Sequence, residues 1–387
     1  MAAGDFTMTS IAPVLYSAAQ KVSAEPVGCL DAVDLSFDDK GVAKGDTIYV
    51  PYTAKNAVAD FTPAATAPLG VAATANSIGI TITASKKDSW SVSGEQERSL
   101  QNGGNAQEWF RLKAANAMRT VRNAAAAACG LEIKKGASRA TGTAGTTPFA
   151  SDLTAITAAQ KILRDNGAPL VDLQIVTDSA AYLNMQNLGL INQAQIAGSA
   201  EERRSGKILN QYGFVVRVDG NIAGHTKGTA TGIDVNLSAG YVAGDTTIVS
   251  NGSDSGTLLA GDVVTWVGDT NKYIVSADTQ SISTTTAGNV IINRPGLRAT
   301  LADTVEMTIG DSYTPTFAFE RSAVVGIMRP PLIPVGGMVV ETMPISDEFG
   351  LTYLLVRTVG YGIITYEIHL AYGFKAVQTE HIALILG

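Results

Sequence analysis

The C-terminal quarter constrains the fold most, because a strict alternation of apolar and polar residues is followed closely by a second apolar run. Positions 364, 366, 368, 370 and 372 hold Ile, Tyr, Ile, Leu and Tyr, and Thr365, Glu367 and His369 lie between them. A period of two is typical of a strand that is buried on one face. We expect Gly373 to end this strand and His369 to lie on its polar, solvent or interface side. Residues 382–386 are also apolar, so we expect a second ordered and packed strand there.

A different period predicts a long helix at residues 105–130. Small and apolar residues recur at spacings of three and four, at Phe110, Ala114, Ala117, Met118, Val121, Ala124, Ala125 and Ala128. At 1.5 Å per residue this helix would be about 40 Å long, and Gly130 is its predicted end. Arg111, Arg119 and Arg122 lie off the apolar stripe. We expect them on a solvated or salt-bridged face, with non-specific contact to DNA as the alternative.

The order of these elements resembles a known family. The ending Ala371-Tyr372-Gly373-Phe374, followed by Glu380 and the final apolar run, is similar to the endings of the major capsid proteins of tailed phages. The long helix stands where that family has its spine helix. The resemblance implies an α+β chain with the Hong Kong 97-like capsid fold: a peripheral domain, an axial domain, an extension loop and an N-terminal arm.

On this basis the chain divides into six parts. They are an N-terminal arm (1–45) with a helix near 11–24, an extension loop (46–92) with strands near 47–53 and 78–84, the spine helix and start of the peripheral domain (93–131), an axial domain (132–227), an inserted β domain (228–312) and a return through the axial and peripheral domains (313–387). The axial part is predicted to hold a helix at 152–166, a strand at 173–177, a helix from Ser179 and a strand at 214–218.

The extension loop is almost free of charge, since Asp60 is the one charged residue between Asn56 and Ser85. An isolated two-stranded hairpin is marginally stable in water. The loop either folds back on its own domain or rests on a neighbouring subunit, and the resemblance favours the neighbour. We therefore predict that Phe61, Leu69 and Val71 make intersubunit contacts.

The segment 228–312 differs sharply from the rest in composition. It is rich in Gly, Thr, Ser and Asp, and its nine acidic and three basic residues account for −6 of the total charge of −7. Short strands near 263–267, 273–277, 289–292 and 306–309 indicate a small barrel or sandwich. An acidic insertion of this kind resembles the coat proteins of short-tailed phages that carry an inserted β domain. We expect it to be either an outward-facing surface domain or simply a solvated loop domain.

Composition excludes several classes of protein. Charged residues are 16% of the chain, against about 25% in an average domain. The net negative charge argues against strong nucleic-acid binding. The most apolar stretch, 323–340, is interrupted by Arg329 and three prolines, so no transmembrane helix is predicted. The N-terminal residues lack the pattern of an export signal. Cys29 and Cys129 predict neither a disulfide framework nor a zinc site.

The sequence carries no recognisable catalytic site. His225, His369 and His381 fall in separate segments without metal-ligand spacing. The Gly-Lys pair at 206–207 lacks phosphate-loop spacing and is followed by Ile208. We therefore predict no enzyme activity, no metal and no cofactor.

The resemblance implies a coat protein that assembles into pentamers and hexamers of an icosahedral shell around double-stranded DNA. Its partners would be copies of itself, a separate scaffolding protein, a portal, packaged DNA through non-specific contacts and possible decoration proteins, with no membrane. It would be assembled in the cytoplasm of a bacterial host and reside in the virion capsid. Some family members join a loop lysine to an asparagine of another subunit. Lys86 and Lys87 lie near the loop base, but nothing in the sequence indicates an activating carboxylate or an acceptor.

Two other functions stay open at this point. An encapsulin-type nanocompartment shares the fold and would enclose an enzyme cargo, although the acidic insertion and the arm argue against it. A bacterial surface or adhesion protein is suggested by the Thr- and Gly-rich β region, although the missing export pattern weakens it.

Overall fold

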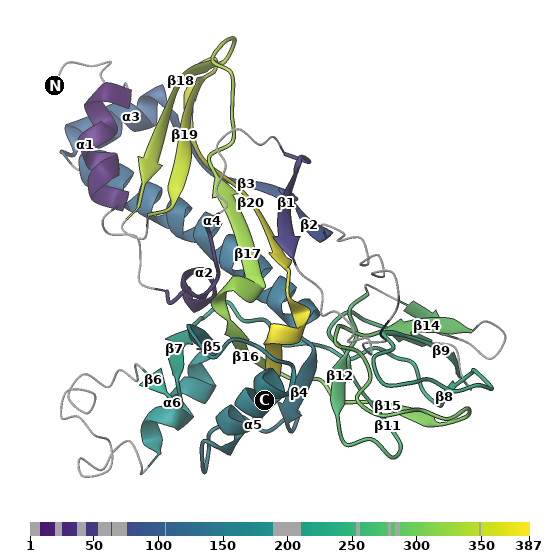
Figure 1. Ribbon diagram of the computed structural model, residues 1–387. Helices are drawn as coiled ribbons and strands as arrows, with labels where there is room; N and C mark the ends of the chain where they lie inside the picture. Colours follow the sequence, from purple (N-terminus) through teal and green to yellow (C-terminus); the bar gives the residue numbers. More distant parts are fainter. Residues whose placement is uncertain are drawn as a thin grey trace.

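The computed structural model describes residues 8–19, 25–36, 44–52, 63, 76–104, 106–188, 210–252, 256–277, 280–282, 287–347 and 350–387. It is a mixed α+β structure. Figure 1 shows the helix α4 running between two bodies, one with α1, α3 and the β18–β19 pair and the other built on a large sheet. We call the first the peripheral body and the second the axial body.

The predicted long helix is α4, Ala106–Gly136, whose 31 residues span about 46 Å. Most of its predicted apolar stripe is buried, with Ala124 and Ala128 partly buried, which confirms most of that prediction. The predicted end at Gly130 is wrong. Gly130 lies inside the helix, where a Cβ would only be in ordinary contact with Phe317, and the helix continues to Gly136, where a Cβ would lie 2.2 Å from that of Ala376.

A five-stranded antiparallel sheet packs on α4 in the peripheral body. Its strands are β3 (Ala84–Ser93), β17 (Val324–Arg329), β18 (Val339–Ser346), β19 (Thr352–Val359) and β20 (Ile363–Ala376). β20 pairs with β3 on one side and with β19 and β17 on the other. α3 (Gly94–Asn102) follows β3, and its N-terminus is closed by a capping box between Ser93 and Gln96.

β20 confirms the predicted alternation and corrects its end. Tyr366 and Ile368 are buried in the core that includes α4. The strand continues through Gly373 to Ala376 instead of ending there. A side chain at 373 would lie 2.2 Å from the Thr81 carbonyl oxygen, so Gly373 allows β2 to cross β20 closely. His369 is buried, not solvent-exposed, because its ring lies against Glu367.

The axial body is built on a sheet in the order β14-β9-β8-β15-β11-β12-β4-β21-β16-β5-β7-β6. From the axial segment and the return come β4 (Arg139–Gly142), β5 (Leu173–Thr177), β6 (Asn210–Gln211), β7 (Phe214–Val218), β16 (Pro315–Glu320) and β21 (Ile382–Leu386). The helices are α5 (Thr154–Asp165) and α6 (Ser179–Asn187). β21 is wholly buried between β16 and β4, which confirms the predicted packed strand.

The insertion supplies the remaining strands. They are β8 (Ile233–Val235), β9 (Thr247–Gly252), β11 (Val263–Trp266), β12 (Lys272–Ile274), β14 (Gly288–Ile291) and β15 (Glu306–Ile309), with β10 (Gly256–Leu258) paired to β13 (Gln280–Ile282). They enclose a separate core that includes Trp266 and Tyr273. The six strands follow one another in the order β14-β9-β8-β15-β11-β12, and a bridge between Val275 and Ile292 brings the end of β12 back to β14, which is the closed arrangement of the expected small barrel. β12 also pairs with β4 and so joins this barrel to the axial sheet.

The described part of the predicted arm packs on its own chain. α1 (Met8–Ala19) contacts α4 and β18, and Leu15 is fully buried. α2 (Gly28–Ala32) lies so close to β7 that a Cβ on Gly28 would be 2.6 Å from the Val218 carbonyl oxygen.

The extension hairpin begins with β1 (Thr47–Tyr52) and returns through β2 (Asn76–Thr81), in antiparallel register. Its base shares a small core with β17 and β20 that includes Val50, Ile80 and Ile327. The hairpin therefore starts from a packed base on the peripheral sheet.

Candidate intersubunit surface

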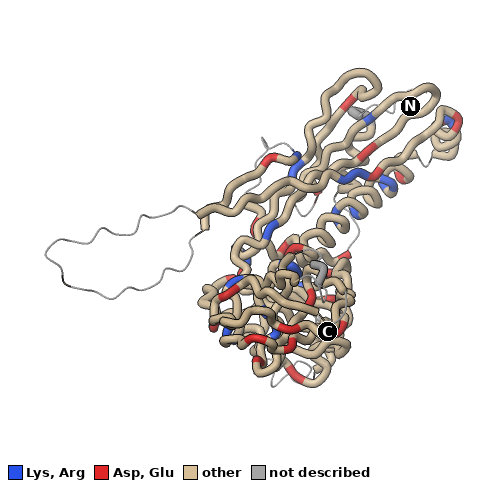
Figure 2. The backbone as a smooth tube through the Cα atoms, turned by 90° about the vertical axis from the view of Figure 1, so that its right-hand side faces the viewer, with Lys and Arg blue, Asp and Glu red and all other residues tan. Residues whose placement is uncertain are grey.

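Exposed apolar side chains concentrate at one end of the peripheral sheet, which we call the peripheral tip. Its residues share high solvent exposure and come from the loop after β17 and from the ends of β18, β19 and β20: Leu332, Val335, Met338, Val340, Val359, Tyr361 and Ile363. Leu332 is 92% exposed and Tyr361 is fully exposed. Figure 2 shows that the strands of the peripheral body are mostly uncharged.

A backbone hydrogen bond joins the two chain segments of the tip, since Val359 N–H donates to the Met338 carbonyl at 3.0 Å. A second bond, from Gly360 N–H to the Ile363 carbonyl at 2.8 Å, closes the turn between β19 and β20. The turn that carries Tyr361 closes at Gly362, whose φ of +73° suits glycine. β19 and β20 pair up to Val359 and Ile364, so Tyr361 lies in the tight turn that joins the two strands.

Single exposed apolar residues are common on soluble proteins, whereas exposed apolar residues that gather in one region generally mark interaction sites. Side chains such as tyrosine and methionine are enriched at the buried centres of protein interfaces. The tip therefore has the chemistry of a surface that another protein covers.

The outer face of the peripheral sheet carries a polar cluster beside the base of the extension hairpin. Lys87 Nζ lies 2.7 Å from Glu367 Oε1, and His369 Nε2 lies 2.9 Å from Glu367 Oε2. Burial raises the pKa of Glu367, but the hydrogen bonds from Lys87 and His369 outweigh it and lower the pKa overall. Burial lowers the pKa of His369, and Glu367 opposes this. Sequence reasoning missed this carboxylate, because Glu367 and Lys87 are 280 residues apart.

The predicted basic face of the long helix is only partly solvated. Arg111 pairs with Glu108 and Arg119 pairs with Glu25, which confirms the expected salt-bridged face for both. The prediction for Arg122 is wrong: it is fully buried, and its guanidinium donates to the Glu25 carbonyl at 3.2 Å. The chain around Glu25 covers this side of α4, which the helical period could not reveal. Arg122 is therefore not available to contact DNA.

Phe61, Leu69 and Val71, the predicted contact residues, lie outside the described residues. The tip was not predicted. Its sequence signals are the Pro330-Pro331 pair and the glycines at 336, 337, 360 and 362, which place apolar residues on turns.

The remaining features limit the chemistry of this surface. In the described part of the chain, no group of three or more His, Cys, Asp or Glu residues could hold a metal ion. None of the described helices is both long enough and apolar enough to cross a membrane. The tip itself is apolar, so packing and desolvation are what it can contribute.

Comparison with known proteins gives distant structural similarities. No protein-family model matches the chain. No curated protein matches it either. Among solved structures, one from Mycobacterium phage Che8 is 13% identical with a TM-score of 0.47, and the match covers 92% of this chain and 90% of that one. The capsid structure of the cyanophage P-SCSP1u is 10% identical with a TM-score of 0.47, covering 94% of this chain and 89% of the other. A virus-like particle from Pyrococcus furiosus is 9% identical with a TM-score of 0.44, covering 97% of both chains.

Proposed function

We propose that this chain is a major capsid protein, the coat subunit of a tailed phage. It self-assembles into pentamers and hexamers, which close into an icosahedral shell around packaged double-stranded DNA. The role is structural and involves no catalytic turnover. The subunit is assembled in the cytoplasm of a bacterial host and ends in the virion capsid.

The observation that carries the proposal is the peripheral tip. Seven exposed apolar residues gather on the loop after β17 and on the ends of β18, β19 and β20, and Tyr361 is fully exposed there. Burying such a patch between copies would supply a favourable free energy of association. The sequence resemblance to tailed-phage coat proteins supports copies of the same chain as the partner.

The other surfaces fit this function. The extension hairpin leaves the peripheral sheet from a packed base, which suits a loop that reaches a neighbouring subunit. Phe61, Leu69 and Val71 stay our predicted contacts within it. The acidic insertion suits an outward face that repels DNA. A separate scaffolding protein, a portal and decoration proteins are the expected further partners.

The mechanism is geometric. Contacts around a ring are heterologous, and they produce a closed ring when the rotation between neighbours closes. Rings joined at their edges produce a shell. Individual contacts are weak, but a closed shell contains many of them, and they stabilise it together.

The experiment that tests the proposal is negative-stain electron microscopy of the full chain, expressed alone and with a candidate scaffolding protein. We expect closed shells under at least one condition. Copurifying nucleic acid would support the phage function, and a copurifying enzyme would indicate a nanocompartment instead. Monomers under both conditions would contradict assembly and favour a surface or adhesion protein.

A further inference from the structure

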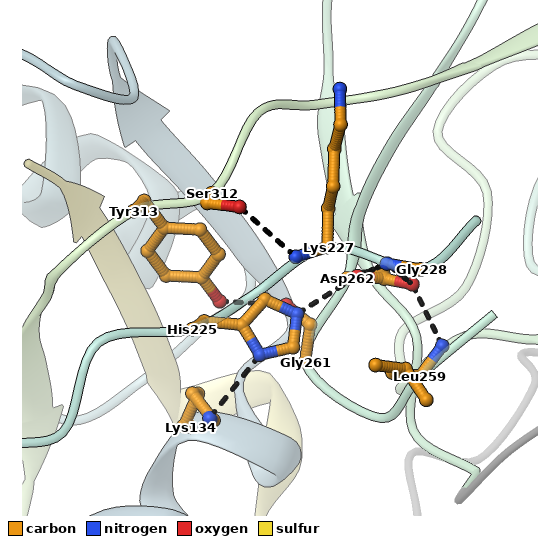
Figure 3. A network of polar contacts seen from close by, with 9 residues as sticks. All are labelled: Lys134, His225, Lys227, Gly228, Leu259, Gly261, Asp262, Ser312 and Tyr313. Atoms are coloured by element: carbon orange, nitrogen blue, oxygen red, sulfur yellow. Dashed lines mark hydrogen bonds and ion pairs between the residues drawn. The ribbon is translucent and has the colours of Figure 1, made fainter.

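A buried chain of three charged or titratable side chains lies where the insertion joins the axial body (Figure 3). Lys134 comes from the last turn of α4, His225 from the segment that enters the insertion, and Asp262 from the turn before β11. Their exposed fractions are 7%, 6% and 0%. Buried charged groups are rare unless they are paired, so their positions here need an explanation.

The segments that enter and leave the insertion form a neck, which we define as residues 225–227 and 311–313. His225 N–H donates to the Tyr313 carbonyl at 2.7 Å, and Tyr313 N–H donates to the His225 carbonyl at 3.1 Å. At the exposed side, Lys227 Nζ lies 2.8 Å from Asp311 Oδ1. The two connections are therefore held to each other as well as to the body.

Asp262 fastens the neck to the insertion. Its carboxylate accepts from His225 Nε2 at 2.8 Å, from Gly228 N–H at 3.1 Å and from Leu259 N–H at 2.7 Å. The phenol of Tyr313 donates to the Gly261 carbonyl at 2.6 Å, on the same turn.

Lys134 fastens the neck to α4. Its Nζ lies 3.3 Å from His225 Nδ1. An ammonium group has donors only, so Nδ1 accepts, and Nε2 carries the hydrogen that is donated to Asp262. Both ring nitrogens of His225 are used in this neutral form, and one positive charge faces one negative charge across the ring.

We propose that this chain is an acid-sensitive latch, which holds the neck on α4 and releases it when His225 and Lys134 are both protonated, while the pairing of β12 with β4 keeps the insertion on the axial sheet. A doubly protonated ring has no acceptor, so its Nδ1–H would meet the Lys134 ammonium donor to donor, with two positive charges and one carboxylate in a buried site. The site accommodates one positive charge, whichever of the two bases carries it.

The other groups around the ring do not relieve this excess charge. Tyr313, which packs on the ring with centroids 5.2 Å apart, is a neutral phenol and already donates to Gly261. Lys227 points to Asp311 on the exposed side of the neck. Burial, followed by the neighbouring Lys135, lowers the pKa of Lys134, and Asp262 opposes this. The surroundings of Lys134 thus already disfavour its positive charge.

Hydrogen exchange of the unassembled full chain tests the latch, with peptides of the neck normalised to peptides of α5 to remove the intrinsic effect of pH. We expect normalised exchange of residues 225–228 and 311–313 to rise between about pH 7.5 and pH 5, the range in which histidine titrates. Because one extra proton drives the opening, the rise is at most about tenfold per pH unit. No rise in the normalised exchange of the wild-type protein would overturn the proposal. An equal rise in the α5 peptides would leave no normalised rise, so it would overturn the proposal as well.

Two substitutions separate the latch from a general loss of stability. Lys134→Met keeps the aliphatic stem but removes the positive charge, so the acid-induced rise should disappear. Lys227→Met, the matched control on the exposed side of the neck, should leave the rise at its wild-type size. A rise of unchanged size in Lys134→Met would assign the effect to another group and overturn the proposal. If Lys134→Met does not fold, His225→Gln provides the same test, because it removes the titrating ring.

Discussion

The peripheral tip and the neck of the insertion solve opposite physical problems. The tip leaves apolar side chains in water, whereas the neck hides charged side chains from it. Within the described chain the neck groups all have partners at hydrogen-bond distance. The tip has backbone bonds but no cover over its side chains. Under the proposed function, the neck is complete within one subunit and the tip is completed by another.

The contrast also separates two kinds of specificity. Apolar contact is non-directional and depends on the area that is buried. A buried polar chain is directional, since each donor needs an acceptor in a defined place. We therefore expect assembly through the tip to tolerate changes of shape better than changes of polarity, and the neck to tolerate neither.

The largest effect is expected at the tip. Tyr361→Asp puts a charge at the centre of a surface that we expect to be buried, and we expect it to abolish shell formation while leaving the subunit folded. Sedimentation velocity measures the first property and thermal unfolding the second. Leu170→Asp, at an exposed apolar residue of the axial body, is the comparison. Shells of normal yield from Tyr361→Asp would remove the tip from the interface.

At the neck, removing the shared carboxylate should destabilise the folded subunit. Asp262→Ala leaves His225 and two backbone donors without their acceptor, and breaking a buried pair in this way costs about 3–5 kcal/mol. Urea unfolding of the unassembled subunit measures the change in the free energy of unfolding. Asp311→Ala, in the exposed ion pair of the same neck, is the matched control and should have no measurable effect. Similar values for the two variants would show that the buried chain adds nothing.

The crossing of β2 over β20 offers a smaller and purely steric effect. Gly373→Ala places a Cβ against the Thr81 carbonyl, so the strands must shift. We expect a loss of about 1–3 kcal/mol in the free energy of unfolding. Gly94→Ala, where a Cβ meets nothing within 4 Å, is the control and should be neutral or slightly stabilising. A neutral Gly373→Ala would mean that the extension hairpin is free to move away from β20.

The smallest effect comes from pH. Burial lowers the pKa of both His369 and His381 from the usual value of 6.5. The folded state then binds fewer protons than the unfolded state, so stability is present above about pH 6.5 and falls as the pH falls below it. The urea concentration at the midpoint of unfolding should decline as the pH is lowered from about 7.5 to about 5, and His381→Gln should make this decline smaller. An increase in stability on acidification would contradict the assigned direction.

Local patterns predicted the elements well. The period of two found β20, the apolar run found β21, and the boundaries of β5 and β7 agree with the predicted strands. Local patterns failed where distant segments meet. Gly130 resembles a helix end but is a packing position, and Arg122 resembles a surface residue but is covered by the chain around Glu25.

The candidate surface was harder to predict than the fold. The tip joins the loop after β17 to the β19–β20 turn, and its exposure depends on the strand register, which the sequence does not state. The Lys134–His225–Asp262 chain draws on three separate segments, so no spacing motif could reveal it. The loop residues Phe61, Leu69 and Val71 stay predictions, since they lie outside the described residues.

The most direct test of the proposed function is a cryo-electron microscopy reconstruction of particles formed by the full chain. The account predicts a closed shell in which Tyr361 and Met338 of one subunit are buried against another copy. A shell whose peripheral tips all face solvent would contradict the proposed interface, and a chain that forms no particles with or without a scaffolding protein would contradict the coat-protein function itself.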